Sequence, residues 1–122
     1  MTVHSGRFEH RVAAITGGAS GVGREAAARI AAEGGHVFLW DRDESALAAA
    51  AAAIPGAQTA RVDVADAAEM TRAAEAAFRA HGRLDVLIAS AGITGPTATL
   101  WEYPPDEWRR VIDVDLHGVF NS

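Results

Sequence analysis

The sequence contains no cysteine, which excludes disulfides, thiolate metal ligands and thiol catalysis. It also contains no lysine. All 11 of its positively charged residues are arginines, so no mechanism that needs a lysine ammonium group is available within these 122 residues. The five histidines show no spacing typical of metal ligands, and we expect no metal site.

A basic surface and long apolar runs are also missing. The formal net charge is -5, so no basic field would attract nucleic acid or an anionic membrane, and we expect neither as a partner. The longest apolar run, residues 46–54, is far shorter than the roughly 18 residues that suggest a membrane span. The first ten residues lack the basic start and apolar stretch of a secretory signal. We therefore expect a soluble, cytoplasmic protein.

What the sequence does have is an alternation of short apolar runs with longer helical patterns. Strands are predicted at 12–16, 36–40, 57–64 and 84–90, and the third, being the most polar, suits a sheet edge. Helices are predicted at 21–33, from an Asp43 cap through the alanine tract 48–53, from an Asp66 cap to about 81–82, and from Asp106 to the end. Strands that alternate with helices indicate a parallel sheet with right-handed crossovers, in one domain without linkers or repeats.

The helical patterns also predict particular contacts. Val22, Ala26, Ala27 and Ile30 share one apolar face of the first helix. Asp66 and Glu69 have the spacing of a capping-box variant at the start of the third. In the last helix, spacing places Asp115 on the same face as the apolar residues Trp108, Ile112 and Val119. We therefore expect the Asp115 carboxylate to be buried or half-buried and bonded to backbone or water.

The most informative stretch is TGGASGVG, residues 16–23, where a strand turns into a helix. Such a turn lets bare backbone approach a pyrophosphate, while the helix N-terminus supplies free amides and positive potential. The glycine spacing is G-x-x-x-G-x-G, at Gly17, Gly21 and Gly23, and no Gly-Lys-Ser/Thr ending is present, which disfavours a P-loop. A tight turn that binds no ligand is the alternative.

Asp41, at the end of the second predicted strand, indicates which dinucleotide is bound. An acidic residue about 20 positions beyond the glycines can accept both hydroxyls of an adenosine ribose and would repel a 2′-phosphate. Ser20 in the glycine loop is not basic and offers such a phosphate no partner. Arg42 is ambiguous, and we interpret it as packed over the adenine or solvated rather than as a phosphate clamp. We therefore expect NAD rather than NADP.

Four segments together resemble the short-chain dehydrogenase/reductase family, in the right order and over essentially the whole chain: TGGASGVG, VDV at 62–64, ASAG at 89–92 and WRRVIDVDLHGVF at 108–120. The resemblance implies a Rossmann-type parallel sheet with strand order 3-2-1-4 and helices on both faces. It implies that Gly17, Ser20, Val22 and Gly23 surround the pyrophosphate, and we count Gly21 with them. It also implies that Asp63 and Val64 touch the adenine, and that Ser90, Ala91 and Gly92 line the nicotinamide-side ribose.

The sequence departs from the family pattern at three places. The family commonly has Asn-Asn-Ala-Gly where this chain has residues 89–92, Ala-Ser-Ala-Gly, and the hydroxyl of Ser90 still allows hydrogen bonding. Asp115 stands where the last helix usually carries the asparagine that helps hold a water connected to the catalytic lysine, so a proton-relay remnant is a second interpretation of Asp115. The family's Tyr-x-x-x-Lys pair is absent, and Tyr103 cannot replace it. We therefore assign no catalytic residue. Trp101 and Tyr103 are interpreted as loop packing residues or substrate contacts.

The resemblance implies an NAD(P)-dependent oxidoreductase that transfers hydride between nicotinamide and an alcohol or ketone substrate. We expect residues 1–122 to form a single dinucleotide-binding domain that is incomplete after the fourth strand and the helix that follows, carries only the cofactor half, and is inactive alone. The alternatives are a non-catalytic module that binds NAD or an adenine nucleotide, and an interaction fragment. Because the fourth strand would form an exposed apolar edge, we expect a homo-oligomer, either a dimer or a tetramer.

Overall fold

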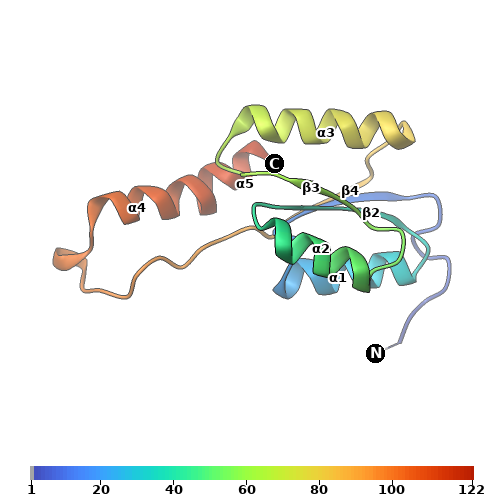
Figure 1. Ribbon diagram of the computed structural model, residues 1–122, viewed down its shortest axis with the longest axis horizontal. Coiled ribbons are helices and arrows are strands. Elements are labelled where there is room, and N and C mark those ends of the chain that lie inside the picture. The colour runs from blue at the N-terminus through green and yellow to red at the C-terminus, as the bar shows by residue number, and fades with distance from the viewer. Residues whose placement is uncertain (1) are drawn as a thin grey trace.

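The structure, a computed structural model, describes residues 2–122 and has a central parallel sheet (Figure 1). The strand order is β3-β2-β1-β4, as predicted. The strands are β1 (Val12–Thr16), β2 (His36–Asp41), β3 (Gln58–Arg61) and β4 (Val86–Ala89). The helices are α1 (Gly21–Ala32), α2 (Glu44–Ala53), α3 (Ala67–His81), α4 (Pro105–Ile112) and α5 (Gly118–Asn121). A 3-10 turn, η1 (Leu100–Glu102), precedes α4, and a π turn, η2 (Asp113–His117), joins α4 to α5.

Helices cover both faces of the sheet. Figure 1 shows α1 and α2 on one side and α3 with α5 on the other. All five residues of β1 are buried, because its alternate side chains enter two different apolar clusters. Val12 and Ala14 pack toward α3, whereas Ala13 and Ile15 pack toward α1 and α2. This arrangement explains why the strand has a continuous rather than an alternating apolar pattern.

Two strands are shorter than predicted, and side chains take over backbone hydrogen bonds at both ends of β4. At the start of β4, the Asp85 carboxylate accepts a hydrogen bond from the amide of Val12 at 2.8 Å. At its end, the amide of Ser90 donates to the Thr16 hydroxyl at 3.1 Å instead of to a strand carbonyl. Strand β3 ends at Arg61 rather than at residue 64, although the Val62 amide still donates to the Asp41 carbonyl at 2.9 Å.

The predicted caps form, with one correction. Asp43 accepts from the amide of Ala46 at the start of α2. Asp66 accepts from two amides at the start of α3. Glu69 does not complete a capping box, however, because its carboxylate accepts from the Asp63 amide at 2.7 Å while the Asp66 amide donates to the Asp63 carbonyl. The prediction that Val22 packs on the buried face of α1 is also wrong, since 80% of this residue is exposed.

The last helix differs most from the prediction. It is helical from Pro105 to Asn121 as expected, but residues 113–117 form a π turn between α4 and α5, and α4 projects away from the sheet (Figure 1). Asp115 was expected to be buried or half-buried, but it lies on the exposed side of the π turn. Two of the three apolar residues that share its predicted face are open too, with Trp108 53% and Val119 50% exposed, whereas Ile112 is half-buried. At the sheet, β4 forms an edge, as expected, and Leu87 on it is 43% exposed.

A cluster of charged residues lies at the end of the sheet where residues 2–11 lead into β1. The Glu33 side chain there has no exposed surface. Its Oε1 accepts from Arg29 Nε at 2.8 Å and from the His4 amide at 3.1 Å, and its Oε2 pairs with Arg7 Nε at 2.5 Å. Burial alone would raise the pKa of Glu33, but these three partners together lower the pKa to about 2.

Candidate functional site

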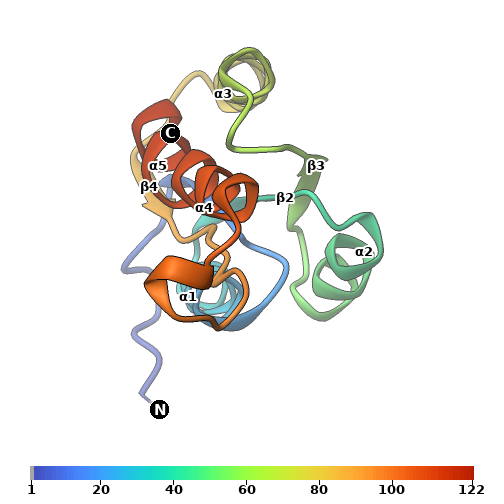
Figure 2. The ribbon, with the colours of Figure 1, turned by 90° about the vertical axis from the view of Figure 1, so that its left-hand side faces the viewer.

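A cleft of about 450 Å³ lies at the carboxyl edge of the sheet. Open parallel sheets bind ligands at this edge, near the point where the strand order reverses. Here the reversal falls between β1 and β4, beside the glycine turn. All the predicted cofactor residues except Gly23 line the cleft: Gly17, Ser20, Gly21, Val22, Asp41, Arg42, Asp63, Val64, Ser90, Ala91 and Gly92. Figure 2 shows the molecule from the side on which α4 projects, so that α4 points toward the reader.

The glycines of the turn serve two different purposes. A Cβ on Gly17, which has φ +62°, would lie 2.8 Å from the backbone of Ala91. A Cβ on Gly23 would lie 2.5 Å from the Gly17 carbonyl oxygen and 2.9 Å from Ser90 Oγ. These two glycines therefore let α1 and the end of β4 approach each other. Gly21 is different, because it has φ +53° and an added Cβ would meet nothing within 4 Å. Gly21 therefore lines the cleft without being packed against the protein's own backbone.

The start of α1 presents unused polar groups to the cleft. Ser20 is the N-cap residue, yet its side chain makes no capping hydrogen bond. No acidic residue lies in the first turn of α1, so the positive end of the helix dipole is not neutralised there. Val22 also lines the cleft and is largely exposed, which explains why it is not part of the buried face. This corner of the cleft is suited to an anion.

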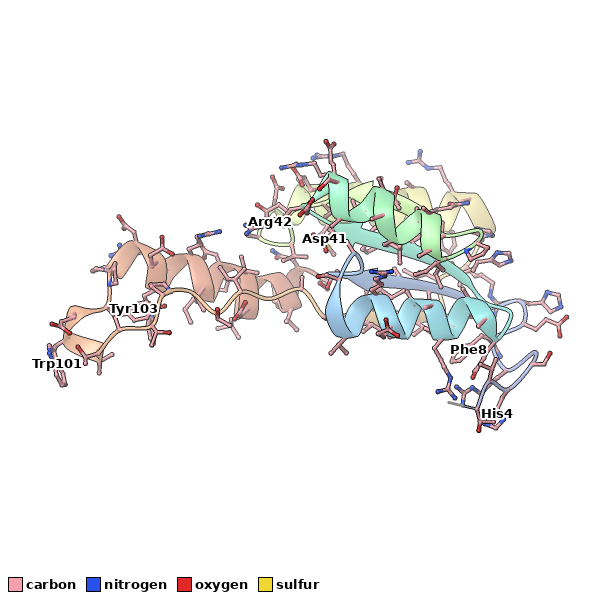
Figure 3. All side chains as sticks on the ribbon, turned by 60° about the horizontal axis from the view of Figure 1, so that its bottom comes forward. His4, Phe8, Asp41, Arg42, Trp101 and Tyr103 are labelled. Atoms are coloured by element: carbon pink, nitrogen blue, oxygen red, sulfur yellow. The ribbon has the colours of Figure 1, made fainter. Side chains whose placement is uncertain are left out.

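Asp41 is held in a fixed position at the end of β2. Its Oδ2 accepts from the Ala19 amide at 3.3 Å, and its Oδ1 accepts from the Asp43 amide at 3.1 Å. Figure 3 shows Asp41 and Arg42 side by side at the carboxyl edge of the sheet. Trp40 was not predicted to belong to the site, but it also lines the cleft although only 2% of it is exposed. Its position as the last apolar residue before Asp41 was the available signal.

The segment after β3 forms another wall of the cleft. Asp63 Oδ1 accepts from the Ala65 amide at 2.9 Å, and Val64 is only 6% exposed. Asn121 was not predicted to contact this segment, but its side-chain amide donates to the Val64 carbonyl at 2.9 Å across 57 positions of sequence. No short-range pattern in the sequence signals this contact.

The segment after β4 is held by two side chains that sequence reasoning did not place in this role. The Thr16 hydroxyl, buried to 1% exposure, accepts from the amides of both Ser90 and Ala91, at 3.1 and 3.2 Å. Asp115 Oδ1 accepts from the Ile93 amide at 2.8 Å. The expectation that Asp115 bonds to backbone is thus confirmed, although its expected burial is wrong.

Trp101 and Tyr103 lie far from the cleft, near the outer end of α4 (Figure 3). The Tyr103 ring packs edge-on against Trp108 with centroids 6.0 Å apart, and the two line a separate pocket of about 200 Å³. The packing interpretation of Tyr103 is therefore the one that the contacts support. Within residues 2–122, no group of three or more His, Cys, Asp or Glu side chains could hold a metal ion. No helix in the described part of the chain is long and apolar enough to cross a membrane.

The sequence of the chain is similar to those of known proteins. A family model described as short chain dehydrogenase matches residues 11–122. The chain is 50% identical over 120 residues to the 2-dehydro-3-deoxy-L-rhamnonate dehydrogenase (NAD(+)) of Sphingomonas sp. (strain SKA58), covering 98% of this chain and 48% of that protein.

Two solved structures are also similar. The crystal structure of levodione reductase superimposes with a TM-score of 0.91 at 36% identity, covering 94% of this chain and 47% of that one. The 3-ketoacyl-(acyl-carrier-protein) reductase from Brucella melitensis, complexed with NADH, has a TM-score of 0.88 at 33% identity, covering 93% and 47%. The chain thus spans about half the length of the relatives it matches.

Proposed function

Because this chain belongs to the short-chain dehydrogenase family, we propose that it forms the NAD-binding part of an oxidoreductase that transfers hydride between the cofactor and an alcohol or ketone. The observation that carries this proposal is the Asp41 carboxylate, fixed by two backbone amides at the rim of a cleft that begins at the N-terminus of α1. We propose that residues 1–122 act as a single dinucleotide-binding domain.

The residues of the cleft fit a dinucleotide in a definite direction. Ser20, Gly21 and Val22 combine open backbone, an uncommitted hydroxyl and the positive end of α1, which suits the pyrophosphate. We propose that Gly17 and Gly23 shape this turn by allowing α1 to pack closely on the end of β4. Asp63 and Val64 then take the adenine, and Ser90, Ala91 and Gly92 take the ribose on the nicotinamide side. When bound, the nicotinamide supplies the carbon that accepts or donates hydride.

The choice of NAD over NADP rests on Asp41. Both of its oxygens already accept one backbone hydrogen bond, so the carboxylate cannot turn away from the cleft without losing them. A carboxylate has further lone pairs with which to accept ribose hydroxyls, and its charge repels a 2′-phosphate. Arg42 is exposed and belongs to the same rim; we assign it to the adenine side rather than to a phosphate.

Proton transfer to or from the substrate needs groups that this sequence does not contain. The family pattern pairs a tyrosine with a lysine, and no lysine occurs among the 122 residues. The residues present can bind and orient the cofactor but include no matched acid and base. This favours a second candidate function, the binding of NAD or an adenine nucleotide without chemistry by these residues alone.

Calorimetric titration of the chain with NAD⁺ and with NADP⁺ tests the proposal. We expect NAD⁺ to bind at least tenfold more tightly than NADP⁺. Failure to bind either dinucleotide would contradict the cofactor assignment. If the chain alone reduces NAD⁺ with any alcohol in a panel, the claim that these 122 residues lack the groups for proton transfer is wrong. The similarity to a sugar-acid dehydrogenase makes polyhydroxy acids a sensible part of that panel.

A cytoplasmic location and a homo-oligomeric assembly belong to the same proposal.

A further inference from the structure

We infer that Asn121 is a positioning residue for the adenine-side wall of the cleft, an inference that rests on the proposed function. Its side-chain amide donates to the Val64 carbonyl at 2.9 Å. Val64 itself lines the cleft and is 6% exposed. Asn121 does not line the cleft, so it acts on the cofactor site only through this segment.

The backbone groups around Val64 show why one distant hydrogen bond matters. The Asp63 amide donates to Glu69, the Ala65 amide to Asp63 Oδ1 and the Asp66 amide to the Asp63 carbonyl. All of these partners lie within the same turn and the start of α3. The bond from Asn121 differs from these three because it joins the segment to a helix 57 positions away in the sequence.

Packing reinforces the same contact. Gly118, one turn before Asn121, is buried against Val64, and a Cβ at this position would lie 2.6 Å from Val64 Cγ2. Val114, on the π turn, is 9% exposed and belongs to the same apolar cluster as Val64. The end of the last helix therefore presses on the side chain of Val64 while Asn121 holds its carbonyl.

The π turn gives this helix a second attachment across the cleft. Asp115 binds the Ile93 amide after β4, while Asn121 binds Val64 after β3. The two walls that we assign to opposite ends of the dinucleotide are therefore fixed to one helical segment. Loss of the Asn121 bond releases only the adenine-side wall, because Asp115 and its partner are untouched.

The test compares N121D with wild type, because aspartate keeps the size of the side chain but cannot donate to the carbonyl. We expect the dissociation constant for ADP-ribose to rise about 5- to 30-fold, the effect of one lost hydrogen bond to a partly buried carbonyl. Hydrogen exchange at the amides of residues 63–66 should accelerate, while exchange in α1 stays unchanged. The matched control is S122A, which removes the 2.7 Å bond from the Ser122 hydroxyl to the Gly118 carbonyl at the same helix end. G118A, whose methyl group would push Val64, provides a second variant and should weaken ADP-ribose binding too.

The outcomes are distinguishable. If wild type binds ADP-ribose and N121D binds it equally well, the positioning role is wrong and the proposed function stands. If S122A weakens binding as much as N121D, the effect belongs to general loosening of the helix end, and the inference is overturned. If wild type binds no ADP-ribose, the proposed function fails and this inference fails with it.

Discussion

Arg29 Nε donates to Glu33 Oε1 at 2.8 Å, although the Glu33 side chain has no exposed surface. The two residues are one helical turn apart at the end of α1, and the pair also holds residues 2–11 through the His4 amide and Arg7. A buried carboxylate is costly unless its charge is matched, and here it is matched by two guanidinium groups. The end of the sheet opposite the cleft is thus fastened by a charge cluster.

Because of this cluster, we expect part of the thermal stability of the fold to be lost at acid pH. The pKa of Glu33 is lowered from 4.5 to about 2, so the ionised form stabilises the fold above about pH 4.5 and that contribution is lost as the pH falls toward 2. E33Q should lower the melting temperature at pH 7, and its difference from wild type should shrink between pH 4.5 and 2. Thermal melts across this range provide the measurement. E25Q, an exposed change on the same helix, is the control, and a constant difference at every pH would contradict the prediction.

The Thr16 hydroxyl should contribute more to the free energy of unfolding than an ordinary surface hydroxyl does. T16V keeps the shape of the side chain but leaves the amides of Ser90 and Ala91 without their acceptor. We expect a loss of about 2–4 kcal/mol in the free energy of unfolding, measured by urea titration. T59V on exposed β3 should change it by less than about 0.5 kcal/mol. Equal effects of the two changes would argue against a special role for Thr16.

Asp41 should set the preference for the dinucleotide. D41N removes the charge and weakens acceptance of the ribose hydroxyls, so the dissociation constant for NAD⁺ should rise about 10- to 100-fold. The ratio of NADP⁺ to NAD⁺ affinity should rise as well, because the repulsion of the 2′-phosphate is gone. Calorimetry with both cofactors measures these changes, and E44Q, at the exposed start of α2, is the control. An unchanged NAD⁺ affinity would remove Asp41 from the site.

The exposed edge of the sheet should make the chain associate. β4 presents unpaired backbone groups on its outer side, and Leu87 there is 43% exposed. We expect sedimentation velocity to show concentration-dependent self-association, and L87K to reduce it by placing a charge on the edge. Association that L87K leaves intact would point to the exposed apolar side chains of the last helix instead. A stable monomer at all concentrations would contradict the expectation.

Features of the fold that depend on short stretches of sequence, such as strands and helix caps, could be predicted. The apolar runs and the caps Asp43 and Asp66 predicted the element order, whereas two walls of the cleft, residues 63–64 and 90–92, were predicted from the resemblance to the family. Contacts between distant positions could not be predicted in this way. The bonds from Ser90 to Thr16 and from Asn121 to Val64 join residues 74 and 57 positions apart, and no periodicity encodes them. The spacing of the glycines did not distinguish their purposes: Gly17 and Gly23 make room for the protein's own backbone, whereas a Cβ on Gly21 would meet only open space.

The π turn at residues 113–117 carries two neighbouring residues that face opposite ways. Val114 is buried in the apolar cluster of Val64, and Gly118, four positions later, is buried against Val64 itself, whereas Asp115 lies on the exposed side. Trp108 precedes the turn and is also exposed, so the helix packs on a different face from the predicted one along its whole length. Because a helix advances about 100° per residue, deleting any single residue of the turn would swing Asn121 off Val64 while leaving the composition of the helix almost unchanged.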